Sequence, residues 1–134
     1  MSECLPSANT ISDQIPSRAA EYLRQAQESL GQPAGSLMLS ASAVDAMLKA
    51  KDLKEGNLKV RINKAAADHL ITNDMAKWAH QVRLDANDQR HSDEDAALPA
   101  QEEAQRCLTF ALALADVLFV LPARVTRGIE ETKK

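Results

Sequence analysis

Apolar residues recur every three or four positions in five stretches of this chain, and short breaks rich in glycine, proline or charged residues separate the stretches. This spacing gives a helix one apolar face. Proline favours the first turn of a helix and glycine its end. The pattern predicts a flexible lead-in over residues 1–14, followed by helices over residues 16–30, 33–53, 58–70, 75–90 and 99–121.

The second and the last predicted helices are apolar on most sides, which is typical of central helices in a bundle. The last helix contains the longest apolar run, residues 110–121, so it is either a core helix or half of a dimer seam. Pro122 is expected to end or kink this helix. The expected organisation is a helical bundle domain over residues 15–121 and a frayed tail over residues 122–134.

The composition also favours an all-α fold. Hydrophobic residues make up 45% of the 134 residues, but aromatic residues only 3%, and alanine and leucine dominate. Alanine and leucine favour helices, whereas aromatic and β-branched residues favour strands. The length is typical of one domain with a single core.

The formal net charge of −3 gives no global basic field that would attract nucleic acid or an anionic membrane. Residues 49–64 are locally basic, with six Lys or Arg against two acidic residues. We interpret them as a solvated lysine-rich loop. The apolar run over residues 110–121 contains Asp116 and is shorter than the roughly 20 residues that cross a bilayer. No membrane association is expected.

Cys4 and Cys107 lie far apart and suggest neither a disulfide framework nor a metal site. The first nine residues lack a basic segment followed by an apolar segment, so no signal peptide is expected. These features predict a protein of the reducing cytoplasm.

The fourth predicted helix concentrates the candidate chemistry. At about 100° per residue, His80, Arg83, Asn87 and His91 share one face. This polar stripe adjoins an apolar stripe on the same helix, which places it at the edge of the core, where a cleft is expected.

Metal-independent RNA cleavage requires a base near the ribose 2′-hydroxyl and a cation near the phosphate. His91 is the candidate base, Arg83 the candidate phosphate ligand, and Asn87 an orienting amide. The alternative is an ordinary solvated helix face. His80 and His91 are eleven residues apart without a nearby cysteine, so neither zinc nor another cofactor is predicted.

Asp45 is a lone carboxylate in an otherwise apolar helix. A buried charge is unfavourable unless it is paired. Two interpretations stay open: Asp45 lies on a residual polar strip with Lys49 and Asp52, or it forms an ion pair inside the bundle.

Several segments together resemble a known family. Ile15 and Pro16 open the first predicted helix, and the second carries the run Leu-x-x-Ser-Ala-Ser-Ala-Val-Asp-Ala-Met-Leu-Lys, in which the aspartate is Asp45. A short basic helix follows, and a long apolar helix closes the domain. The segment from Arg83 to His91 is similar to the pattern Arg-x-x-Gly-Asn-x-x-x-His. Over residues 15–121 the chain resembles a bacterial branch of uncharacterised domains in the HEPN-like class (higher eukaryotes and prokaryotes nucleotide-binding).

The resemblance implies an antiparallel bundle of four to five helices that forms homodimers, often beside nucleic-acid-directed defence enzymes. Many members of the wider class cleave RNA with an Arg-polar-x-x-x-His motif, whose polar residue and histidine correspond to Asn87 and His91. The arginine of that motif corresponds to position 86, which is alanine here. We therefore hypothesise that Arg83 is structural and pairs with Asp45 across the bundle.

Two functions follow as predictions. The first is a non-catalytic dimerising module that binds a protein or nucleic-acid partner, in a defence-related system. The second is a metal-independent ribonuclease or nucleotide-binding enzyme that uses His91, Asn87 and Arg83 across a dimer cleft. A purely structural helical adaptor is a third, weaker alternative.

Overall fold

The computed structural model describes residues 11–82, 84 and 98–133. All regular structure in these residues is helical, which confirms the all-α prediction. The elements are α1 (Ser17–Glu28), α2 (Pro33–Ala50), α3 (Leu58–Ala67), α4 (Asn73–Val82), α6 (Gln101–Ala115), the π-helical turn η2 (Asp116–Val120) and α7 (Leu121–Thr132).

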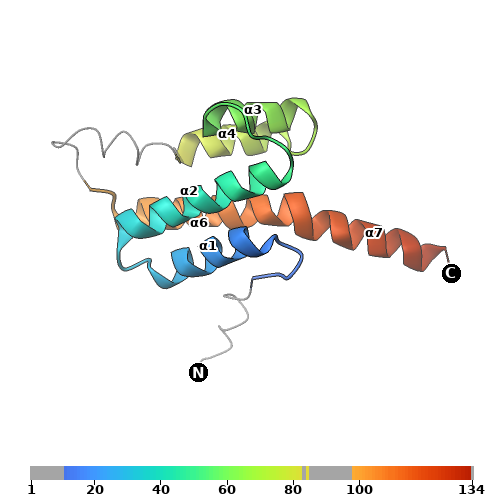
Figure 1. Cartoon of the computed structure of the whole chain (residues 1–134), viewed down its shortest axis with the longest axis horizontal. Coiled ribbons are helices and arrows are strands. Elements are labelled where there is room, and N and C mark those ends of the chain that lie inside the picture. The colour runs from blue at the N-terminus through green and yellow to red at the C-terminus, as the bar shows by residue number, and fades with distance from the viewer. Residues whose placement is uncertain (1–10, 83, 85–97, 134) are drawn as a thin grey trace, which may run out of the picture.

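The central helix of the bundle is α2, which packs mainly against α1 and α6. Figure 1 shows α1 on one side of α2 and the α3–α4 pair on the other, while α6 runs behind α2. The largest fully buried side chains come from α1, α2, α6 and η2, and include Phe110, Leu23, Leu37, Met47, Leu48 and Leu114. The two helices that the sequence pattern marked as central, α2 and α6, therefore do supply much of the core.

Small polar side chains position the helices. The buried Ser36 hydroxyl on α2 donates to the Ala26 carbonyl on α1 at 2.7 Å, which ties these two helices together. The Asn57 side chain accepts a hydrogen bond from the Val60 N–H at 2.9 Å and caps α3, and Thr72 caps α4 through the Met75 N–H at 3.0 Å. Such caps satisfy N–H groups that lack partners in the first turn of a helix.

Two helices end earlier than the apolar pattern predicted. The helix expected over residues 33–53 ends at Ala50, and the one expected over residues 58–70 ends at Ala67. Asp52 and His69 have φ angles of 65° and 62°. Because a residue with positive φ cannot continue a right-handed helix, these residues turn the chain toward the next element.

The last helix does not end at Pro122, and residues 122–132, which the sequence pattern assigns to a frayed tail, are helical. A proline inside an α-helix lacks an N–H and clashes with the carbonyl four residues earlier. Here the wider turn η2 precedes the proline, and the Leu121 N–H bonds the Asp116 carbonyl five residues back. The π-helical turn thus lets the helix pass through Pro122, and α7 projects beyond the bundle (Figure 1).

The continuous helix Gln101–Thr132 is long and apolar enough to cross a membrane by length and composition alone. The core helix of a soluble protein passes the same test, and α6 contributes Ala104, Cys107 and Phe110 to the core. The expectation of no membrane association was based on a shorter apolar run, and it stays a prediction.

Candidate functional site

The polar stripe predicted on the fourth helix lies largely outside the described residues. Arg83, Asn87 and His91 fall in the part of the chain that the structure does not describe, so their proposed roles stay predictions. His80 lies in the last turn of α4, where its Nε2 is 2.8 Å from Asn63 Oδ1 on α3. Because that oxygen can only accept, Nε2 carries the proton, and the histidine links α3 to α4.

Asp45 lies at the centre of a charged cluster between α2 and α3. Its Oδ1 is 2.6 Å from Nη2 of Arg61, and its Oδ2 is 2.9 Å from Nζ of Lys49 one helical turn away. The Arg61 side chain is 8% exposed, whereas that of Asp45 is 33% exposed. The carboxylate therefore neutralises a guanidinium that is more deeply buried than itself.

Two opposing effects set the pKa of Asp45. Burial of the carboxyl group acts to raise the pKa, because desolvation disfavours the charged form. The hydrogen bonds and positive charges of Lys49 and Arg61 act in the opposite direction and outweigh burial, so the pKa of Asp45 is lowered. The carboxyl group of Asp45 is thus ionised at neutral pH. Because its lowered pKa makes it a weak proton acceptor, we interpret it as a structural anion and not as a catalytic base.

Arg61 also contacts the segment that joins α2 to α3. Its Nη1 donates to the Leu53 carbonyl at 3.4 Å, and its Nε has no hydrogen-bond partner among the described residues. The sequence pattern assigns Arg61 to a solvated basic loop, but in the structure Arg61 is buried. Its position beside Ile62, one turn before Ala65 on the buried face of α3, was the only signal in the sequence, and it is a weak one.

The predicted pairing of Asp45 with Arg83 is not tested, because Arg83 lies outside the described residues. Within the described residues, Arg61 and Lys49 are the partners of Asp45. The sequence left two interpretations of Asp45 open, and the structure contains elements of both. Asp45 contacts Lys49 on its own helix, and it also contacts Arg61 on α3.

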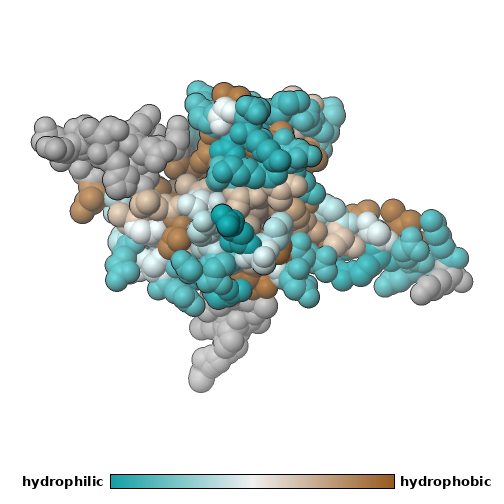
Figure 2. All heavy atoms as spheres, in the orientation of Figure 1, coloured by the Kyte–Doolittle hydropathy of each residue, from teal (hydrophilic) through white to brown (hydrophobic). Residues whose placement is uncertain are grey.

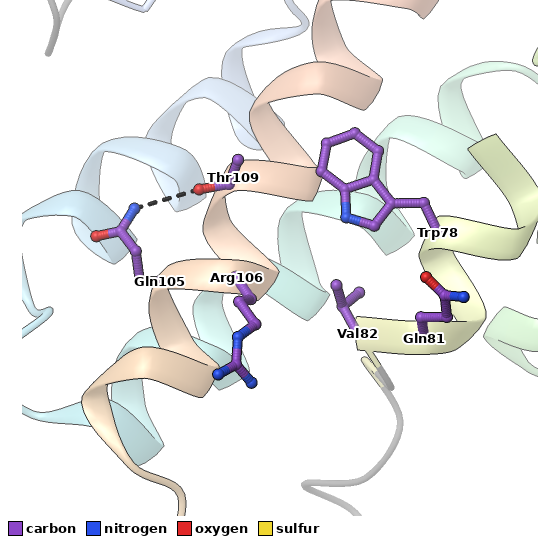
Figure 3. A pocket seen from close by; sticks show the side chains of 6 residues that line it. All are labelled: Trp78, Gln81, Val82, Gln105, Arg106 and Thr109. Carbon is purple, nitrogen blue, oxygen red and sulfur yellow. Dashed lines mark hydrogen bonds between the residues drawn. The ribbon is translucent and has the colours of Figure 1, made fainter. Parts of the chain in front are cut away.

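A pocket of about 290 Å³ opens between α4 and α6. Figure 3 shows its lining, which consists of Trp78, Gln81, Val82, Gln105, Arg106 and Thr109. The indole of Trp78 packs edge-to-face on Phe110, with ring centroids 5.2 Å apart. Arg106 is exposed and its Nη2 lies 3.8 Å from Glu102 Oε2, so a solvent-exposed ion pair stands at the pocket rim.

The second unusual surface is on α7, which buries none of its residues. Leu121, Val125 and Ile129 follow one another at four-residue spacing and are 50–52% exposed. In Figure 2 their part of the molecule appears as brown side chains along the protruding helix, among hydrophilic neighbours. We call these three residues the α7 stripe.

A family model described as a domain of unknown function, DUF4145, matches residues 12–132. The chain belongs to the DUF4145 family. No curated protein and no solved structure matches it. The match spans the DUF4145 domain from the residues before α1 to the end of α7, so the charged cluster, the pocket and the α7 stripe all lie within it.

No group of three or more His, Cys, Asp or Glu residues that could hold a metal ion occurs within residues 11–82, 84 and 98–133. In this part of the chain the clustered charges are those around Asp45, and they are paired with one another.

Proposed function

We propose that this DUF4145 domain is a non-catalytic, HEPN-like module that forms homodimers and engages a protein or nucleic-acid partner in a defence-related system. The observation that carries the proposal is the α7 stripe, in which large apolar side chains lie on a helix that buries nothing in its own bundle. Contiguous exposed apolar residues commonly mark interaction sites. In a homodimer, such a surface is buried against the same surface of a second copy, so no other molecule is needed to cover it.

The HEPN-like assignment rests on the sequence motifs around Asp45 and between Arg83 and His91, and the all-helical fold is compatible with it. The non-catalytic assignment rests on Ala86, which stands where the motif of ribonucleolytic members has arginine. The charged cluster is compatible with this assignment, because the Asp45 carboxylate is ion-paired with Arg61 and Lys49 and offers no free base.

The dimer is tested by sedimentation velocity and by light scattering of the purified chain at concentrations up to roughly 100 micromolar. We expect a reversible monomer–dimer equilibrium. A monomer at every concentration would contradict the dimerising function. Incubation with labelled RNA, in parallel with His91→Ala, tests the non-catalytic assignment, and cleavage that the variant loses would contradict it.

The second candidate is a metal-independent ribonuclease or nucleotide-binding enzyme that uses His91, Asn87 and Arg83. The pocket between α4 and α6 favours it, because an indole can stack on a base and a guanidinium can bind phosphate. Trp78 is the only tryptophan in the chain, so its fluorescence reports directly on the pocket. Saturable quenching by a nucleotide that weakens in Arg106→Ala, but not in Arg124→Ala on α7, would support this candidate.

A further inference from the structure

The distribution of charge along α7 indicates how two copies of the chain would pair. Leu121, Val125, Gly128 and Thr132 follow one another at spacings of four, three and four residues, the seam spacing of paired helices. A Cβ atom at Gly128 would meet no atom within 4 Å other than those of its own helix backbone and chain neighbours, so the surface there is open to close approach. These four residues form one face of α7, which we call the seam, and Ile129 lies beside it.

The two flanks of this seam differ in chemistry. Arg124 and Glu131 lie on one flank, about two helical turns apart. Pro122 and Ile129 lie on the other flank at the same separation. Arg124 and Glu131 are both exposed, and neither forms an ion pair with another described residue. One flank therefore carries a positive and a negative charge at its two ends, and the other is apolar.

We propose that α7 binds α7 of a second copy of this chain in antiparallel orientation, an inference that rests on the proposed dimerising function. In an antiparallel pair each flank faces the same flank of the partner, which sets Arg124 of each copy opposite Glu131 of the other. The apolar flanks then meet as well, Pro122 against Ile129. A parallel pair would instead place Arg124 of each copy against Ile129 of the other, which matches a charge with an apolar side chain.

The helix is short, so the interface is small. Twelve residues of α-helix extend for roughly 18 Å, and interfaces of limited area are typical of weak, reversible complexes. We therefore expect a dissociation constant on the order of micromolar. The far side of α7 carries Arg127 and Glu130, which remain in solvent in this arrangement.

Charge-reversal variants of the full chain test the orientation. Arg124→Glu and Glu131→Arg each place like charges opposite one another twice per homodimer. We expect the dissociation constant to rise about tenfold in each. An equimolar mixture of the two variants has opposite charges at both contacts in an antiparallel heterodimer, so mixing should restore association to the wild-type level.

Matched controls lie on the same helix. Arg127→Glu and Glu130→Arg change the net charge by the same amounts on the far side of α7, and we expect both to leave the dissociation constant within about twofold of wild type. Far-UV circular dichroism should be unchanged in all four variants, because no residue of α7 is buried.

The outcomes separate this inference from the proposed function. A wild-type chain that dimerises but responds equally to Arg124→Glu and Arg127→Glu would overturn the antiparallel pairing and leave the dimerising function standing. Restoration that fails on mixing would also overturn it. A wild-type chain that stays monomeric would overturn both, and so would a monomer that floats with phosphatidylcholine vesicles and loses this in Val125→Glu, since a bilayer would then cover the stripe.

Discussion

The charged cluster around Asp45 and the α7 stripe depart in opposite ways from the usual division between an apolar interior and a polar surface. Arg61 is a charged residue with an 8% exposed side chain, whereas Val125 and Ile129 are aliphatic and 52% exposed. The first departure is compensated within the chain, because Asp45 and Lys49 complete the cluster. The exposed apolar side chains of the α7 stripe are not buried by any other described residue. The comparison teaches that the cluster is satisfied within the fold, whereas the stripe is left exposed for the partner that we propose.

The largest effect on stability is expected from Arg61→Ala. The substitution removes a buried guanidinium and leaves the partly buried carboxylate of Asp45 with Lys49 alone. Loss of one partner of a buried ion pair is strongly destabilising, and the partial exposure of Asp45 reduces the effect to about 2 kcal/mol of unfolding free energy. Urea denaturation measures it, with the exposed Lys59→Ala on the same helix as the control. Equal losses in the two variants would show that Arg61 does not hold the fold.

A smaller effect is expected from the coupling within the cluster. In a double-mutant cycle, Asp45→Ala and Arg61→Ala should differ from additivity by about 1 kcal/mol, because each removes the same contact. The same cycle with Arg83→Ala tests the ion pair that the sequence predicted. Coupling there would place Arg83 in the cluster as well, and simple additivity would exclude it.

The acid limb of the stability profile isolates the contribution of Asp45. The pKa of this carboxyl group is lowered in the folded chain, so its contribution is complete above the ordinary aspartate pKa. The contribution is then lost as the pH falls through the lower pKa of the folded state. The stability difference between wild type and Asp45→Asn should therefore shrink below about pH 4. A difference that stays constant down to pH 2 would mean that the carboxylate is not stabilised by its partners.

The smallest effect is expected on α7, where two valines offer a matched comparison. Val44 on α2 is fully buried, whereas Val125 on α7 is half exposed. We expect Val125→Ala to lower the unfolding free energy of the monomer by less than about 0.5 kcal/mol, whereas the buried reference Val44→Ala lowers it by about 1.5 kcal/mol. Thermal or urea unfolding well below the dimerisation concentration measures both. A large loss in Val125→Ala would show that α7 stabilises its own bundle.

The sequence pattern predicted the helical fold well, because the periodicity of apolar residues depends only on the helix repeat. It placed α2 and α6 in the centre from their wide apolar faces. It failed at the ends of helices, since Asp52 and His69 adopt positive φ angles without being glycine. It also failed at Pro122, because the π-helical turn that accommodates the proline has no signature in spacing.

The candidate chemistry was predicted less completely. Asp45 was recognised as an anomaly from its apolar surroundings, but Arg61 was not recognised as its partner. Which cation reaches a partly buried carboxylate depends on how two helices pack, and the distance between two side chains in space cannot be read from their separation along the chain. Of the stripe formed by His80, Arg83, Asn87 and His91, only His80 lies in the described residues, where it bonds Asn63.

The sequence by itself determined that this chain is helical and that the apolar faces of α2 and α6 lie in the core, because both follow from local periodicity and from the unfavourable hydration of apolar side chains. Only the tertiary structure decided that Asp45 pairs with Arg61 and that the last helix continues beyond the bundle with its apolar side chains in solvent. Those outcomes depend on contacts between distant segments and on whether an element finds a surface to cover it. The α7 stripe finds none within the described residues, and this is why a second copy of the chain is the partner we propose.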